Sequence, residues 1–499
     1  MVGVACQCLI LASTFASRTV FVKQLGAEYL GINSLFSNVL AVLAVTEMGI
    51  GNILLYSLYK PLYEQNYEKI GVILRFFKKI YYWIAAGIFI FGIVIAPALI
   101  YITTTSVVGD HELLLYYSLF LFNAAISYFV VHKTILINAD QRIFIVQLAN
   151  TGSILVRDVC QIAVLFVTGN YLIYLIVQII TTILYIVIIN VVANKLYPFL
   201  LIKSKWFIAA DEKFEIKKNL KAIFIYRVSV LLMNYTDNIL ISAMLGTIIV
   251  GYYSNYLIII SAIISFINIL IHSMYSSIGN RNASQDSEGS FSLFRFLVFM
   301  FHWISTVSSV CIIVAMNDFI AVWIGEQYVL SDDVLISIVV NFFVQVVITP
   351  VWVYRETIGI FDKVKYVMLM AAIINIVLSV ILGKMIGLPG IIIATAIARI
   401  LTNVWYEPRL LFRLKFEKPV KIYWTIQSKY IVITMMCIAF AFWLNRYFGS
   451  QFVWLLLKIG IAAAMTTLLF FVLNVNSFEM QTARLYWKEL LNKKGIKKV

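Results

Sequence analysis

The sequence predicts an all-α polytopic membrane protein of about fourteen transmembrane helices, and three observations predict it. Of the 499 residues, 62% are hydrophobic and only 13% are charged, whereas soluble domains are about 45–50% apolar and about 25% charged. Apolar stretches recur at about 20 residues, the length that a helix needs to cross a bilayer core of about 30 Å. The strict alternation of β-barrel strands is absent. This composition excludes a cytosolic enzyme, a nucleic-acid-binding protein and a secreted domain.

The predicted spans follow one another along the whole chain with short connections. Pro97 and Pro350 are expected to kink the third and the tenth of them, because proline removes a backbone hydrogen bond inside a helix. The spans are 1–22, 33–57, 79–102, 113–136, 144–167, 171–193, 221–245, 250–275, 293–316, 333–353, 366–386, 390–408, 430–446 and 452–473.

The orientation follows from the distribution of lysine and arginine. With the N-terminus in the cytoplasm, the connections on that side hold 31 of the 39 basic residues and the outer connections hold four. Cytoplasmic loops of membrane proteins carry this excess. Both termini are therefore predicted to be cytoplasmic. The net charge of +15 is a consequence of this topology and does not indicate a nucleic-acid partner.

The outer connections leave little room for catalysis. Three of them (168–170, 246–249 and 387–389) are only a few residues long, and the longest runs from about 317 to 332. A membrane glycosyltransferase needs acidic catalytic residues on a substantial outer loop. The sequence also contains neither a nucleotide-binding GxxxxGK[ST] loop nor a histidine or cysteine pattern typical of metal sites. We therefore predict that the protein is not an enzyme and holds no metal or resident cofactor.

A short repeat indicates two related halves. Residues 25–31 read LGAEYLG and residues 245–251 read LGTIIVG, so the pattern LGxxxxG recurs 220 residues later, between the first two spans of each half. Glycine at such a point allows a left-handed turn and close helix approach. In chain order, we predict an N-terminal lobe of six helices at 1–193, a cytoplasmic linker at 194–220, a C-terminal lobe of six helices at 221–412, two additional helices at 413–473 and a basic cytoplasmic tail at 474–499. Two pseudo-equivalent bundles are typical of transporters that rock around a central cavity, and a purely structural membrane protein is the alternative.

Several charged residues fall inside the predicted spans. A charge at the bilayer centre costs roughly 2.5–3.5 kcal/mol on insertion scales, so it is expected to face a cavity or a partner. The cationic candidates are Arg18, Arg157, Arg227 and Arg399. Guanidinium groups bind phosphate oxygens through paired hydrogen bonds, and this set therefore predicts an anionic substrate.

Internal ion pairing is the competing interpretation of these charges. Arg157 and Asp158 are adjacent, but neighbouring residues on a helix point about 100° apart, so we do not expect them to face each other. Arg227 and Asp237 are ten residues apart and are expected to share one broad face without contact. Glu407, beside Pro408, is expected at the cytoplasmic interface.

Several motifs resemble the polysaccharide-transport branch of the MOP exporter superfamily, to which the Wzx-type oligosaccharide flippases belong. The resemblance extends from the first span through the eighth, and the last third is similar mainly in hydropathy. The motifs are Ser17–Gly31 (SRTVFVKQLGAEYLG), Glu47–Gly51 (EMGIG), Leu58–Leu62 (LYKPL), Asn138–Arg142 (NADQR), Tyr235–Ser242 (YTDNILIS) and Ser277–Asn280 (SIGN).

The resemblance implies a V-shaped, MATE-like arrangement of two lobes in a bacterial cell membrane. It also implies a flippase that moves undecaprenyl-diphosphate-linked oligosaccharide repeat units from the cytoplasmic to the outer leaflet, alongside a polymerase and other polysaccharide-assembly proteins. In this hypothesis Arg18, Arg157, Arg227 and Arg399 offset the diphosphate charge. The buried carboxylates of Glu47, Asp158 and Asp237 are candidates for coupling to protons or sodium ions.

Two alternatives share the architecture. One is a MATE-type exporter of drugs and cations, and the other is a flippase of peptidoglycan lipid precursors.

Overall fold

The computed structural model describes residues 2–43, 50–103, 105, 107–201, 210–283, 287–445 and 452–482. The contacts divide the chain into two units, residues 1–254 and 255–499. All regular elements in the described ranges are helical, which confirms the predicted fold class.

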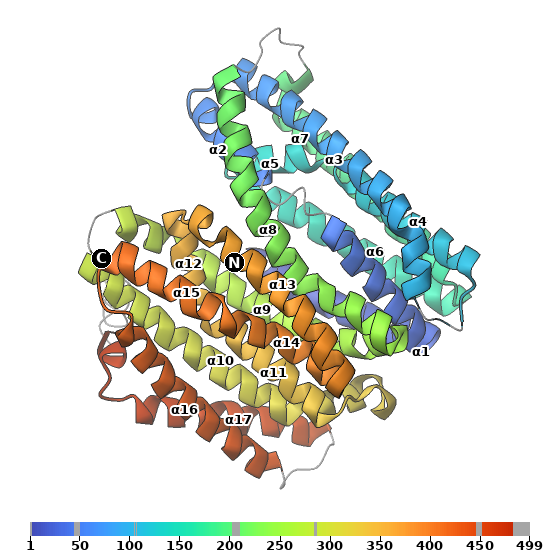
Figure 1. The fold of residues 1–499 in the computed structure, drawn as a ribbon. Coiled ribbons are helices and arrows are strands. Elements are labelled where there is room, and N and C mark those ends of the chain that lie inside the picture. Colours follow the sequence, from blue (N-terminus) through green and yellow to red (C-terminus); the bar gives the residue numbers. More distant parts are fainter. Residues whose placement is uncertain are drawn as a thin grey trace, which may run out of the picture. The chain divides into compact units, whose positions relative to one another are not determined.

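The first unit contains the helices of the N-terminal half and α8 (Figure 1). Their bounds are α1 (Val2–Leu43), α2 (Ile50–Tyr63), α3 (Tyr67–Ile102), α4 (Asp110–Ser127), α5 (Val131–Ala139), α6 (Ile143–Thr168), α7 (Tyr171–Leu196), the 3₁₀ turn η2 (Pro198–Leu201) and α8 (Ala210–Leu245). Within this unit α1 packs against α6 and α8, and α6 packs against α7.

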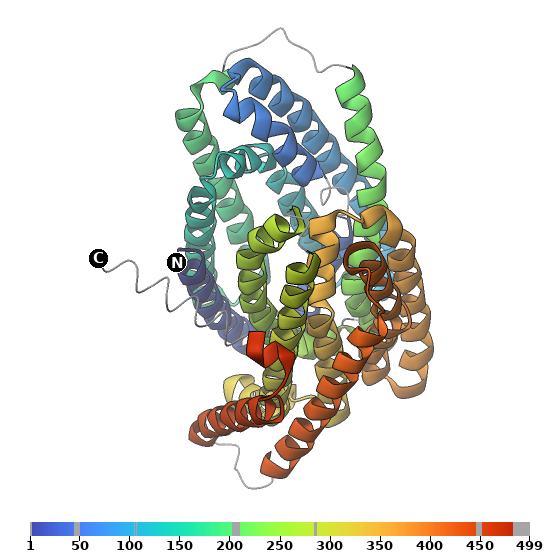
Figure 2. The same cartoon turned by 90° about the vertical axis from the view of Figure 1, so that its left-hand side faces the viewer.

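The second unit begins within α9 (Thr247–Ala283) and contains the remaining helices. These are α10 (Ser287–Ile324), the 3₁₀ turn η3 (Glu326–Tyr328), α11 (Asp332–Val347), α12 (Thr349–Ile358), α13 (Phe361–Ile386), α14 (Leu388–Leu401), α15 (Asn403–Leu411), the π-helical turn η4 (Phe412–Phe416), α16 (Lys421–Asn445) and α17 (Phe452–Leu473). The core helix is α10, because α11, α16 and α17 all pack against it. Figure 1 shows α16 and α17 below α10, and Figure 2 shows the same helices from a second side.

The described residues contain thirteen helical stretches that are long and apolar enough to cross a membrane. One of them, Ala5–Leu43, is counted as a single stretch, although the backbone leaves the helical conformation at Gly26 (φ 82°, ψ −176°). Gly26 therefore separates two helices, and counting both agrees with the fourteen predicted segments. The protein is a multi-pass membrane protein.

The tenth predicted span is interrupted where the sequence indicates. Helix α11 ends at Val347 and α12 begins at Thr349, with Pro350 in the first turn of α12. Proline has no N–H to donate to the preceding turn. The break therefore lies where the proline removes a hydrogen bond, and it forms one wall of the pocket described below.

Candidate functional site

Three of the predicted site residues lie together in the first unit. The Nε and Nη2 atoms of Arg157 donate hydrogen bonds to Oδ1 of Asp158, at 2.9 and 2.8 Å. Ser13 Oγ donates to the other carboxylate oxygen, Oδ2, at 2.6 Å. Arg18 and Arg157 both lie within electrostatic range of Tyr174. The two arginines and the aspartate of this cluster, which we call the arginine cluster, carry a summed charge of +1.

Helix packing explains this convergence. Arg18 lies on α1, Arg157 and Asp158 on α6, and Tyr174 on α7, and α6 packs against both of the other helices. The ring of Phe21, one turn after Arg18, contacts the ring of Tyr174 edge to face at 5.1 Å between centroids. Arg18 Nη2 also donates to Ser254 Oγ in α9. The cluster therefore joins four helices through polar groups inside an apolar bundle.

The expectation that Arg157 and Asp158 do not face each other is wrong. The Asp158 side chain is only 2% exposed, whereas that of Arg157 is 33% exposed. The Cα–Cβ directions of adjacent residues do diverge, but the long arginine side chain folds back over its neighbour and reaches the carboxylate. Burial of the acid drives this contact, because an isolated buried carboxylate is costly.

Arg399 lies in the second unit, in α14, and is buried with 4% exposure. Its Nη1 donates to Oδ1 of Asn341 at 3.0 Å and to Oε1 of Gln345 at 3.5 Å, both on α11. These partners are neutral amides, so they satisfy the N–H groups without removing the positive charge.

The structure describes only some of the other predicted site residues. Asp237 is buried in α8 with 7% exposure. Glu47 and the side chain of Arg227 lie outside the residues that the structure describes. The structure thus brings Arg18, Arg157 and Asp158 together, and it places Arg399 and Asp237 on other helices.

A fully buried ion pair was missed by the sequence analysis. Arg355 Nη1 lies 3.0 and 2.9 Å from the two carboxylate oxygens of Glu407, and the two side chains are 3% and 1% exposed. Glu407 is therefore buried within the protein, and its position at the cytoplasmic interface of the membrane stays a prediction. The prediction placed Arg355 in a cytoplasmic connection, because the sequence does not show that α12 continues past Tyr354.

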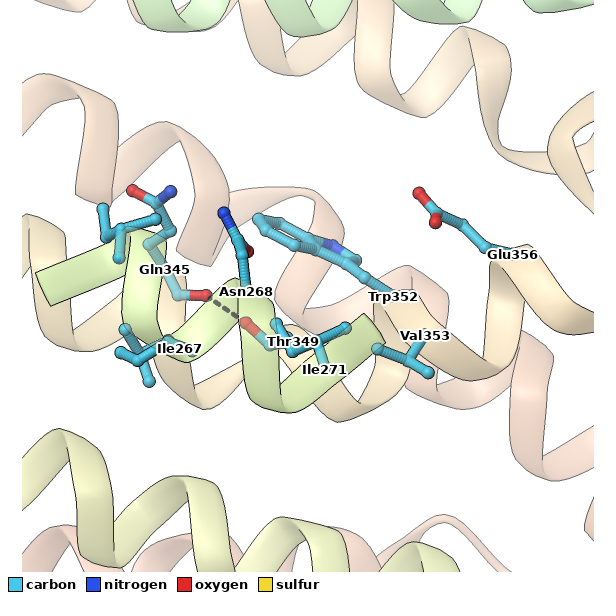
Figure 3. A pocket seen from close by; sticks show the side chains of 10 residues that line it. Ile267, Asn268, Ile271, Gln345, Thr349, Trp352, Val353 and Glu356 are labelled. Carbon is cyan, nitrogen blue, oxygen red and sulfur yellow. Dashed lines mark hydrogen bonds between the residues drawn. The ribbon is translucent and has the colours of Figure 1, made fainter. Parts of the chain in front are cut away.

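A pocket of about 180 Å³ opens in the second unit between α9 and the α11–α12 break. Helix α9 contributes Ile264, Ile267, Asn268 and Ile271, and the other wall contributes Gln345, Val346, Thr349, Trp352, Val353 and Glu356. In Figure 3 the amides of Gln345 and Asn268, the Trp352 indole and the Glu356 carboxylate lie along one side, above the aliphatic groups. Gln345, which accepts from Arg399, connects this pocket to a predicted site residue.

The pocket residues follow a periodicity that the sequence shows. Gln345, Thr349, Trp352 and Glu356 are spaced by four, three and four residues, which is the spacing of one helix face. Only Glu356 of these four residues is charged, and it lies after the predicted span 333–353, so charge alone does not reveal the stripe. Its helical spacing would have predicted the pocket wall from the sequence.

Solved structures of similar fold are transporters. No protein-family model matches the sequence, and no curated protein matches it. An inward-facing multidrug resistance MATE family transporter of the MOP superfamily aligns with a TM-score of 0.60 at 13% identity, covering 81% of this chain and 94% of that one. The lipid II flippase MurJ, in an inward closed conformation, aligns with a TM-score of 0.60 at 16% identity, covering 97% of this chain and all of MurJ. This chain has the fold of MOP-superfamily transporters.

A third structure extends the comparison to a complex. The MATE multidrug transporter DinF-BH, solved with a bound compound, aligns with a TM-score of 0.56 at 17% identity, covering 84% of this chain and 97% of that one. The MATE structures thus leave more of this chain unmatched than MurJ does.

Proposed function

We propose that the protein is a MOP-superfamily flippase that moves undecaprenyl-diphosphate-linked oligosaccharide repeat units from the cytoplasmic to the outer leaflet of a bacterial cell membrane. The observation that carries this proposal is the arginine cluster, in which two guanidinium groups and one carboxylate gather among apolar helices. A net cationic group in this setting suits a diphosphate, because arginine forms paired, charge-assisted hydrogen bonds with phosphate oxygens.

The fold supports a flippase over a drug exporter. MurJ and this chain align over almost their whole lengths, whereas the two MATE structures described above cover 81% and 84% of this chain. MurJ is a lipid II flippase, so its named substrate is a lipid and not a drug. The motifs around Arg18 resemble the polysaccharide-transport branch, and this resemblance selects the repeat-unit substrate over a peptidoglycan precursor.

We propose different roles for the individual site residues. Asp158 already accepts hydrogen bonds from Ser13 and Arg157, so it holds Arg157 in place. Arg157, 33% exposed, and Arg18 then supply the guanidinium groups that meet the diphosphate. Arg399 and Arg227 are proposed as further phosphate ligands, and Asp237 and Glu47 as the carboxylates that couple transport to protons or sodium ions.

The test is translocation in liposomes that contain the purified protein and an undecaprenyl-diphosphate-linked fluorescent saccharide. The fraction of label that a membrane-impermeant quencher reaches reports movement between leaflets. We expect the wild type to move the lipid and the double variant Arg18→Ala, Arg157→Ala to lose at least tenfold in initial rate. That loss corresponds to about 1.4 kcal/mol.

The matched control removes a guanidinium group that is outside the cluster. Arg413 is exposed in η4, and Arg413→Ala is expected to transport at the wild-type rate. Wild-type transport by the Arg18, Arg157 double variant would contradict the proposed role of the cluster. Efflux of ethidium by the wild type without lipid translocation would instead identify a drug exporter.

A further inference from the structure

The pocket between α9 and the α11–α12 break combines an apolar floor with a polar rim. Ile264, Ile267 and Ile271 recur at helical spacing on α9, and Val346 and Val353 face them from the other wall. The rim consists of two amides, one carboxylate and one indole (Figure 3). Small-molecule sites are built in this way, from apolar walls with a few polar groups that fix orientation.

The charges around the rim cancel. Glu356 lies 3.6 Å from Nη2 of Arg355, which also binds Glu407. Arg399 reaches the rim through Gln345. Glu356 alone of these four charged residues lines the pocket, and its charge together with those of Arg355, Glu407 and Arg399 sums to zero. An electroneutral rim gives no net attraction to a cation or an anion, and it favours a neutral ligand that forms many hydrogen bonds.

The volume of the pocket also limits the size of its ligand. Sites for drug-sized molecules enclose about 300–1,000 Å³, and this pocket encloses about 180 Å³. A single sugar ring has the matching chemistry, because its C–H faces are apolar and its hydroxyl groups project from the edge. The aromatic body of Trp352 offers the C–H groups a flat apolar surface, and the amides and carboxylate offer partners to the hydroxyl groups.

We propose that this pocket is a carbohydrate subsite that holds one pyranose ring of the transported saccharide, with Trp352 as the stacking residue and Asn268, Gln345 and Glu356 as hydrogen-bonding residues. The inference rests on the proposed function, since it assigns the saccharide part of the substrate to the second unit. For this subsite Arg399 is a positioning residue that acts through Gln345, in addition to its proposed role as a phosphate ligand. By binding Oε1 of Gln345 it turns the amide Nε2 donor away from itself and leaves it for a ligand oxygen.

Direct binding tests this subsite without transport. The full-length protein is placed in lipid nanodiscs, because alkyl maltoside detergents carry sugar headgroups. Saturation-transfer-difference NMR is recorded with three probes, the methyl glycosides of glucose, galactose and N-acetylglucosamine. We expect the wild type to bind at least one of them. Trp352→Ala is expected to weaken that binding about tenfold, with a smaller loss for Trp352→Phe, which keeps an aromatic face.

Two further variants separate a binding defect from misfolding. Asn268 is exposed, so Asn268→Ala removes an amide from the rim without opening the core, and we expect it to weaken the same probe. Trp83, 78% exposed on α3 in the first unit, serves as the tryptophan control, and Trp83→Ala is expected to bind as the wild type does.

The experiments distinguish failure of the subsite proposal from failure of the proposed function. Absence of a signal from all three glycosides with the wild type, or wild-type binding by both Trp352→Ala and Asn268→Ala, would overturn the subsite. Translocation of undecaprenyl diphosphate without a sugar, lost on mutation of the arginine cluster, would leave the flippase proposal intact in that case. Glycoside binding by a protein that translocates no lipid would overturn the flippase and retain the subsite.

Discussion

Arg355 and Glu407 form the most deeply buried of the ion pairs described in this chain, and their energetics differ from those of a surface pair. Both groups lose their hydration, and the two short contacts at 3.0 and 2.9 Å compensate for that loss. A buried pair of this kind contributes little net stability compared with two apolar residues, but removal of one partner leaves an unpaired charge in the protein interior.

Removal of either partner is therefore expected to destabilise the protein. Arg355→Met should lower the free energy of unfolding by about 3–5 kcal/mol, because the Glu407 carboxylate stays buried without its main partner. The double variant Arg355→Met, Glu407→Leu should recover most of this loss. Thermal unfolding of the purified protein, followed by fluorescence, measures both effects.

A surface pair provides the control. Lys418 and Glu288 are 2.7 Å apart, with side chains 27% and 80% exposed, and Glu288→Ala is expected to cost less than about 1 kcal/mol. Equal losses in the single Arg355 variant and the double variant would show that the lost packing, rather than the stranded charge, accounts for the effect.

The sequence predicts some of the charges that lie within spans, but it does not predict their partners. The sequence placed Arg157 and Arg399 within spans, and the structure finds both there. It did not show that Arg157 binds its own neighbour or that Arg399 binds amides. Those outcomes depend on side-chain reach and on which helices pack together, and neither has a signature in the local sequence. Lys458 lies within the predicted span 452–473, and its partner, Asp318 of α10 at 2.6 Å, likewise has no signature in the local sequence.

At the scale of helices, the repeated LGxxxxG pattern has a physical explanation. Gly26 and Gly246, its equivalent first glycines, both have left-handed backbone conformations, with φ of 82° and 100°. The second glycines, Gly31 and Gly251, allow close contact between the two copies. A Cβ atom on Gly31 would overlap the carbonyl oxygen of Thr247, and one on Gly251 would overlap that of Ala27.

These two contacts are equivalent under the 220-residue repeat, since Ala27 corresponds to Thr247 and Gly31 corresponds to Gly251. The two copies therefore cross with pseudo-two-fold symmetry. This crossing, and the packing of α8 on α1, also explain why residues up to 254 group with the first unit. The predicted lobes, which end at residue 193 and begin again at residue 221, are inferred from the sequence repeat. The division of the chain by contacts does not test them, so they stay a prediction.

Enlargement of a glycine at the crossing is expected to separate the helices. Gly31→Ala and Gly251→Ala should each destabilise the protein by about 1–3 kcal/mol, the usual cost of overpacking, because the obstructing atoms belong to the backbone. Thermal unfolding measures this loss. Gly152 in α6 has no atom within 4 Å of the position that an added methyl group would take, so Gly152→Ala should be neutral or stabilising. A neutral result at both Gly31 and Gly251 would refute the close crossing.

At the scale of the whole molecule, the solvent is the lipid bilayer, and this explains which predictions succeed. Helix number and position follow from apolar length, which the bilayer imposes directly. Exposed apolar side chains such as Val94 and Val167, 70% and 84% exposed, are ordinary at a lipid-facing surface. Sites are harder to predict, because the pocket in the second unit is lined largely by residues such as Gln345 and Trp352 that carry no charge.

The topology follows from the same solvent, and it yields a prediction for the whole chain. Basic residues are retained in the cytoplasm during insertion, so the hairpin after α2 is expected inside and the η3 turn outside. Glu64 and Gln327 are exposed at these two places. In a variant without the five native cysteines, Gln327→Cys should react with a membrane-impermeant maleimide in intact cells, whereas Glu64→Cys should react only after permeabilisation. The reverse labelling pattern would show that the chain has the opposite orientation in the membrane. The predicted cytoplasmic entry of the substrate would then be on the wrong side.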